Sequence, residues 1–150
     1  MRFLLLTLLG LSALGCGEAV DEAGADALWR ELQESDYRSF ERAPGYDAAR
    51  PTIRAHGDTA LVFINPVVVA ALAGEAIEAW PEGSLLAKDS YSGGKLRLVA
   101  AMKKNQDGWF FAEWSGSGEV KYAGSPSVCT NCHSAGGDNV LALGLPEGSP

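Results

Sequence analysis

The feature that most constrains this chain is the pentapeptide Cys129-Thr130-Asn131-Cys132-His133, close to its C-terminal end. The spacing Cys-x-x-Cys-His is typical of covalent haem attachment, since two thiols about one helical turn apart can each add to a vinyl group of the same haem. The histidine that follows then becomes an axial ligand of the iron. The sequence therefore predicts one haem c per chain, with thioether bonds from Cys129 and Cys132 and iron ligation by His133.

Three other interpretations of the motif stay open at this stage. Cys-x-x-Cys is also found in thiol–disulfide pairs, in halves of zinc sites and in small structural disulfides. A zinc site needs four ligands, and beyond the motif the mature chain has only His56 as a further histidine or cysteine. A thioredoxin-type pair belongs to a βαβ unit, which the sequence pattern does not contain. Haem attachment is the interpretation that we favour.

The N-terminal residues 1–16 have the pattern of an export signal. A short positive segment, Met1-Arg2, precedes an apolar run from Phe3 to Leu14. That run is shorter than the roughly 20 residues that span a bilayer. Ala13-Leu14-Gly15-Cys16 resembles a lipobox, which predicts lipidation at Cys16; an ordinary signal peptide cleaved nearby is the alternative. We expect an exported protein, periplasmic or associated with the outer membrane through a lipid anchor.

Composition narrows the function. The 150-residue chain has a formal net charge of −7, which argues against a nucleic-acid partner. Acidic residues are concentrated after the signal, which indicates a solvated linker and a polar helix face. We predict an acidic linker with a short helix over residues 17–36, a c-type haem-binding domain over 37–145 and a tail over 146–150.

Periodicity and turn residues predict an α+β fold. The expected helices cover residues 24–34 and 66–79, the second with Asn65 as its N-cap. The expected strands cover residues 59–64, 84–91, 95–104 and 108–115. Residues 35–52 and the Gly/Ser-rich segment before the motif are expected to be loops. Short connections make the later strands antiparallel neighbours, so we predict an antiparallel sheet of about four to five strands with two or more helices, and the haem packed on the sheet.

Several segments together resemble the cytochrome P-460 and cytochrome c′-beta family of mono-haem, sheet-built periplasmic proteins. The resemblance runs from about Tyr37 to Leu141. It rests on the segments His56-Gly57, Leu61 to Asn65, Pro81 to Lys88, Gly108 to Phe111, Cys129 to His133 and Asp138 to Leu141. The family commonly has Phe where Leu141 stands.

The resemblance implies a homodimer and one of two functions. In the enzyme branch, a lysine is cross-linked to the haem macrocycle, the iron oxidises hydroxylamine, and a redox partner protein is required. In the other branch, five-coordinate haem capped by apolar or aromatic residues binds nitric oxide or similar gases. The sequence leaves open whether this chain is an enzyme.

Two further residues take candidate roles from the resemblance. Lys88 stands where the cross-linking lysine of the enzyme branch lies; the simpler interpretation is an ordinary strand lysine. Trp80 precedes it by the interval at which an apolar side chain caps the distal haem face, although it could equally pack at the edge of the core.

A hydroxylamine oxidase also needs a base near the sixth position of the iron to accept protons, and the resemblance implies that this base is a distal carboxylate. Residue type offers Glu113, Asp89 and Glu119, and the sequence does not choose among them.

The remaining question is the sixth iron ligand. Met102 shares a strand face with apolar residues and is expected in the core, and His56 is expected to be a hydrogen-bonding loop residue. We therefore predict an exported mono-haem c-type cytochrome with an open sixth site that binds or oxidises small nitrogen species such as nitric oxide or hydroxylamine. The alternative is a plain periplasmic electron-transfer cytochrome with His56 or Met102 as sixth ligand.

Overall fold

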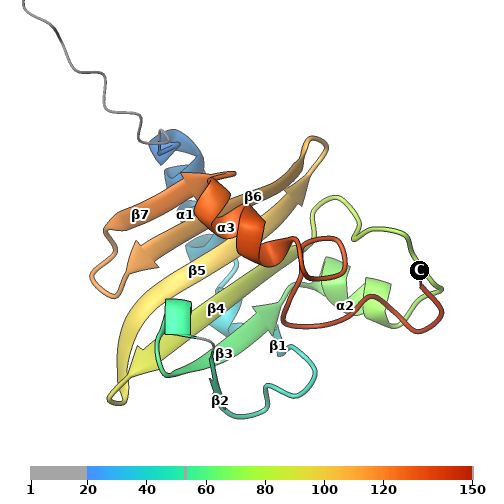
Figure 1. Cartoon of the computed structure of the whole chain (residues 1–150), viewed down its shortest axis with the longest axis horizontal. Coiled ribbons are helices and arrows are strands. Elements are labelled where there is room, and N and C mark those ends of the chain that lie inside the picture. The colour runs from blue at the N-terminus through green and yellow to red at the C-terminus, as the bar shows by residue number, and fades with distance from the viewer. Residues whose placement is uncertain (1–19, 53, 150) are drawn as a thin grey trace, which may run out of the picture.

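A computed structural model describes residues 20–52 and 54–149 (Figure 1). Over these residues the chain forms three α-helices and a seven-stranded antiparallel open sheet, which confirms the predicted α+β class. The sheet has the order β1-β3-β4-β5-β6-β7, and β2 also pairs with β3. The helices are α1 (Glu22–Glu34), α2 (Pro66–Leu72) and α3 (Ser127–His133), and the strands are β1 (Glu41–Arg42), β2 (Arg50–Pro51), β3 (Thr59–Ile64), β4 (Leu85–Ser92), β5 (Lys95–Asn105), β6 (Gly108–Ser115) and β7 (Val120–Gly124). The predicted export signal and Cys16 lie outside the described residues.

The sheet is larger than predicted. The four predicted strands correspond to β3–β6, with ends that agree to within one residue. Strand β7, in the segment expected to be a loop, pairs with β6 from Phe111↔Gly124 to Trp114↔Val120. Strands β1 and β2 have two residues each and pair with β3. Segments this short carry too little periodicity to be recognised, and pairing with a neighbouring strand determines their conformation.

Helices α1 and α2 each begin after a residue whose side chain caps them, and Asn65 is the N-cap predicted for the second. Asp21 Oδ1 accepts a hydrogen bond from the Gly24 N–H at 2.9 Å, so α1 begins two residues before its predicted start. Asn65 Oδ1 accepts from the Val68 N–H at 3.2 Å, as an N-cap does. However, α2 ends at Leu72 rather than near Ala79. Gly74 follows the helix, and glycine is a poor helix former.

The two faces of the sheet are covered differently. Helix α1 packs on one face, where Ala25, Leu28 and Leu32 are 0–4 % exposed, so the helix predicted beside the acidic linker is part of the core. In Figure 1, α3 and the C-terminal segment cross the opposite face. The tail, expected to fray, contacts the segment after α2, because Ser149 Oγ accepts a hydrogen bond from the Ile77 N–H at 3.0 Å. Among the residues described, no helix is long and apolar enough to cross a membrane.

Candidate functional site

A cavity lies on the sheet face opposite α1, and its floor is set by strand register. Lys88 on β4 pairs with Ala100 on β5, and Ala100 pairs with Glu113 on β6, so these three side chains form one row on the same face. The parallel row two residues along is Leu86, Met102 and Phe111. The floor therefore has one apolar row and one row that carries a cation and a carboxylate around a small alanine.

The cavity has about 1100 Å³ of space between its walls, counting its open mouth. One wall comes from α3 and the segment after it, through Cys129, Cys132, His133 and Val140–Ala142. The other comes from Tyr46, Pro51, Thr52, Ala55 and His56. Most of the surface that lines the cavity is apolar, as in ordinary ligand pockets. The cavity therefore suits a large, mainly apolar group.

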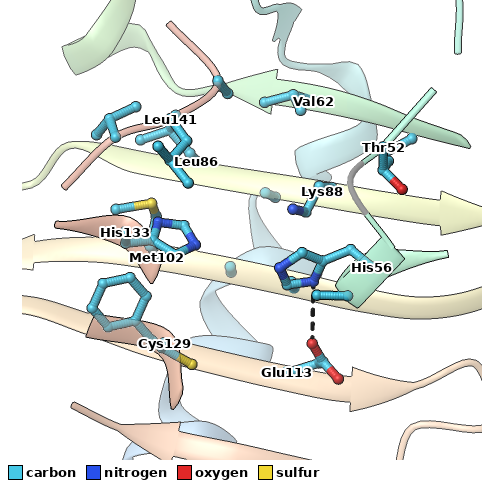
Figure 2. Close-up of a pocket in the computed structure, with 18 of the residues that line it drawn as sticks. Thr52, His56, Val62, Leu86, Lys88, Met102, Glu113, Cys129, His133 and Leu141 are labelled. Carbon is cyan, nitrogen blue, oxygen red and sulfur yellow. Dashed lines mark ion pairs between the residues drawn. The ribbon is translucent and has the colours of Figure 1, made fainter. Parts of the chain in front are cut away.

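The predicted attachment motif forms α3. Cys129 and Cys132 are three residues apart, so a single helical turn presents both to the cavity wall. Cys129 is partly buried and Cys132 is exposed. The structure thus brings together the two thiols and the histidine that the sequence singled out, beside one cavity (Figure 2).

His133 is held in one tautomer by the segment that follows α3. Its Nδ1 lies 2.9 Å from the carbonyl oxygen of Asn139. A carbonyl can only accept, so Nδ1 carries the proton and Nε2 keeps its lone pair. The ring also contacts Phe111 edge-on, with centroids 5.1 Å apart. Burial lowers the pKa of His133, which favours the neutral imidazole that a metal ion binds. A hydrogen bond from Nδ1–H to a carbonyl is the usual support of a metal-ligating histidine.

Lys88 points into the same cavity (Figure 2). Burial lowers the pKa of its ammonium to about 8, although the nearby Glu113 carboxylate and the two cysteine thiols act in the opposite direction. A substantial fraction of Lys88 is therefore an uncharged amine at mildly alkaline pH. Burial thus distinguishes Lys88 from an ordinary solvent-facing strand lysine, and its position is compatible with the role that the resemblance implied.

The structure distinguishes the three carboxylates that residue type could not. Glu113 lines the cavity, where its Oε2 lies 3.3 Å from Nδ1 of His56, and Figure 2 shows this pair and Lys88 on the opposite side of the view from His133. Asp89 lies on the opposite face of the sheet, bonded to Tyr37 and Arg38. Glu119 forms an ion pair with Lys121 near the β6–β7 turn.

The Glu113–His56 pair is close but imperfectly aligned. His56 Nδ1 is buried, and its 3.3 Å contact with Glu113 lacks hydrogen-bond geometry. The two side chains are 25 % and 17 % exposed, respectively. A buried polar atom without good hydrogen-bond geometry is costly, and it marks a place where a bound polar molecule could complete the hydrogen bonds. His56 thus belongs to the cavity wall and is more than the loop residue expected from the sequence.

Trp80 is not placed as the predicted distal cap. It is 2 % exposed in a core cluster with Val140 and Trp109, and it is absent from the cavity lining. Its backbone N–H donates to Asp138 instead. The second interpretation, an aromatic that packs in the core, describes its position. Met102 is 6 % exposed in the same cluster and also forms part of the floor, as expected of a core residue.

The donor set of the cavity fits a covalently attached haem. Two thiols one turn apart, a neighbouring imidazole with an unprotonated Nε2 and a large apolar floor are the protein features that this group needs. Over residues 20–52 and 54–149, no group of three or more His, Cys, Asp or Glu side chains is arranged to hold a metal ion, so a zinc site built only from protein ligands has no ligand set there. No model of a protein family matches the chain, and no curated protein matches its sequence.

Proposed function

We propose that this chain is a c-type haem protein whose cavity binds small nitrogen species, such as nitric oxide, at an open iron position. The observation that carries the proposal is the convergence of Cys129, Cys132 and His133 on one large cavity, with His133 Nδ1 bonded to the Asn139 carbonyl. When bound, the haem would supply a coordination position for the ligand and a one-electron couple. Each thiol S–H would add across a vinyl group, forming a C–S bond and a new C–H bond without an oxidant.

The chain's own side chains would define the ligand pocket. His133 Nε2 would hold the iron from one side. Leu86, Met102 and Phe111 would exclude water from the apolar part of the floor. The polar end, Glu113 with His56, would accept or donate hydrogen bonds to the bound molecule. Lys88, in the same row of the sheet as Glu113, would supply a buried amine.

One observation favours a second candidate function, the oxidation of hydroxylamine. Such a reaction releases protons as electrons leave through the iron to a redox partner protein, so it requires a nearby proton acceptor. Glu113 is a carboxylate that lines the cavity, and His56 lies beside it with its side chain 25 % exposed. These residues could accept a proton and pass it outward.

The electron-carrier alternative requires a sixth ligand from the chain. Met102 lies in the floor row beside Leu86 and Phe111, and His56 is engaged with Glu113. Both residues line the cavity, so the coordination state must be measured. An open high-spin iron supports ligand binding, whereas a six-coordinate low-spin iron supports electron transfer.

The deciding experiment is export of the full chain from a host competent in cytochrome c maturation, followed by intact mass and absorption spectra. We expect one haem per chain, retained after denaturation, a high-spin spectrum and a spectral change on adding nitric oxide. The double variant Cys129→Ala/Cys132→Ala should be exported without covalent haem. Colourless wild-type protein with both thiols free or joined to each other would refute the proposal.

Proteolysis of the same holoprotein tests the role of Lys88. Haem recovered on a peptide that contains Lys88, as well as on the Cys129–Cys132 peptide, would indicate the cross-linked enzyme branch. Haem confined to the cysteine peptide would refute the cross-link.

A further inference from the structure

The segment after α3 adopts a conformation that requires support. Asp138 and Asn139 both have positive φ values, 46° and 66°, which residues other than glycine rarely adopt. Consecutive backbone hydrogen bonds close this segment, from Gly136 N–H to His133 and from Asn139 N–H to Gly136. Sparsely populated backbone conformations persist only where surrounding contacts hold them. The surroundings of Asp138 therefore decide where the next carbonyl, that of Asn139, is placed.

The Asp138 carboxylate is the contact that ties this segment to the rest of the fold. Its Oδ2 accepts the Trp80 backbone N–H at 2.9 Å, and both of its oxygens lie 2.9 Å from Lys104 Nζ on β5. The two charged side chains are 14 % and 17 % exposed, so the pair is shielded from solvent. Lys104 also lies over the Trp109 ring, 5.4 Å from its centroid. The Asp138 carboxylate thus connects the segment after α3 to strand β5 and to the backbone at Trp80.

The position of this segment affects the hydrogen bond of His133. Asn139 directly follows Asp138, and its carbonyl accepts the His133 Nδ1–H bond that fixes the tautomer and the ring. A metal-ligating imidazole becomes more basic when its other N–H is hydrogen-bonded, and such outer partners tune the metal. Lys104 and Asp138 do not line the cavity, so they act only through this chain of contacts.

We infer that Asp138, paired with Lys104, is a positioning residue for the axial histidine, holding the Asn139 carbonyl against His133 Nδ1 and so setting how strongly His133 donates to the haem iron. This inference rests on the proposed haem function. It predicts that breaking the pair changes the iron although neither residue touches it.

The test compares Asp138→Ala, Asp138→Asn and Lys104→Met holoproteins with wild type. Two readouts are the Fe–His stretching band of the ferrous protein and the reduction potential, which is measurable whatever the coordination number. In Asp138→Ala we expect the band to move to lower frequency and the potential to rise, since a weakened Nδ1–H bond makes the imidazole a poorer donor. Asp138→Asn keeps an acceptor for the Trp80 N–H, and Lys104→Met keeps the carboxylate, so both should shift less and in the same direction.

Glu31→Gln is the matched control. It removes the ion pair between Glu31 and Lys103, whose Nζ lies 2.6 Å from Glu31 Oε2. Lys103 is the residue before Lys104 on β5, and this ion pair lies on the α1 side of the sheet. This variant should leave both readouts at wild-type values, because a general loss of an ion pair does not reach His133. A shift in Glu31→Gln as large as in the Asp138 variants would overturn the inference.

The outcomes separate this inference from the proposed function. Asp138→Ala protein that carries haem with an unchanged band and potential would overturn the positioning role alone. If Asp138→Ala fails to fold or mature, Asp138→Asn and Lys104→Met decide, and wild-type values in both would overturn it equally. Wild-type protein without covalent haem would overturn the proposed function and this inference together.

Discussion

The two faces of the sheet treat neighbouring charged residues of β4 in opposite ways. Asp89, on the α1 face, is 1 % exposed, and its carboxylate accepts bonds from Tyr37 Oη at 2.7 Å and from Arg38 Nε at 2.6 Å. Lys88, one residue earlier, faces the cavity, where burial lowers its pKa to about 8. Removing one partner of a buried, hydrogen-bonded charge is strongly destabilising, whereas a buried amine with a perturbed pKa beside a cavity is typical of a functional site.

Packing shows the same contrast. The α1 face carries a row of small residues in register, Ala87, Ala101, Ala112 and Ala123, against which α1 packs. The cavity face has Ala100 between Lys88 and Glu113, and no α-helix of the described part of the chain fills the cavity above it. Small side chains thus admit a helix on one face and leave a cavity on the other. The predictions below test this division between a structural face and a functional face.

The largest effect is expected at Glu113. In the oxidation function, Glu113→Gln should lower the hydroxylamine oxidation rate roughly 100-fold or more, because positioned proton acceptors contribute about that much. The matched control is Glu119→Gln, which removes a carboxylate 69 % exposed at the neighbouring turn and should leave the rate unchanged. Steady-state rates of the two holoproteins check this. Equal rates in Glu113→Gln and wild type would remove Glu113 from the chemistry.

Stability should separate Asp89 from Lys88. Asp89→Ala leaves the buried Tyr37 hydroxyl and one side of Arg38 without their acceptor, so we expect a loss of roughly 3 kcal/mol in the free energy of unfolding. Lys88→Met replaces a buried amine by an apolar side chain of similar length and should be neutral or stabilising. Urea unfolding of the two variants measures both. Destabilisation of similar size in both would contradict the division of the faces.

The pH dependence of stability should carry the signature of Lys88. Its pKa is about 8 in the folded protein and near 10.5 when unfolded, so between these values the unfolded state binds more protons and stability rises with pH. The rise should amount to up to roughly 3 kcal/mol relative to Lys88→Met. Burial and the Asp89 hydrogen bond raise the pKa of Tyr37, which lowers stability above about pH 10.

The measurement is the unfolding free energy of wild type and Lys88→Met from pH 7 to 9.5. This window lies below the range in which the tyrosines ionise in the unfolded state. Parallel curves for the two proteins would show that the Lys88 amine is not stabilised in its neutral form.

The smallest effect is expected from a pair of alanines on opposite faces. Ala101→Leu pushes a larger side chain against the packed α1 face and should cost about 1–3 kcal/mol of stability. Ala100→Leu extends into the cavity and should cost less, while slowing ligand binding to the holoprotein. Unfolding midpoints and ligand association rates test the pair. An equal stability loss would indicate that the cavity face is as tightly filled as the other.

Sequence pattern predicted the regular parts of this fold well. Strands β3 to β6 are β-rich segments bounded by clear turn residues, so their ends agree with the prediction to within one residue. Strand β7 and the early end of α2 were missed, because pairing to β6 and the local effect of Gly74 outweigh weak propensities there. The sequence showed only that an aromatic residue, Trp80, follows the second helix, and tertiary packing places its side chain in the core.

The residues of the candidate site also fall into those that local sequence spacing identifies and those that only tertiary contacts bring together. Spacing alone singled out Cys129, Cys132 and His133, since local helical geometry determines which side chains share a turn. The structure also places Glu113, and neither Asp89 nor Glu119, in the cavity. Two of its contacts join residues far apart in the sequence: Asp138 and Lys104 are 34 positions apart, and Glu113 and His56 are 57 positions apart. Such pairs depend on strand register and on how the chain returns over the sheet, which no local pattern encodes. The sequence by itself determined which residues could hold the proposed haem, and the tertiary structure decided which residues surround that site.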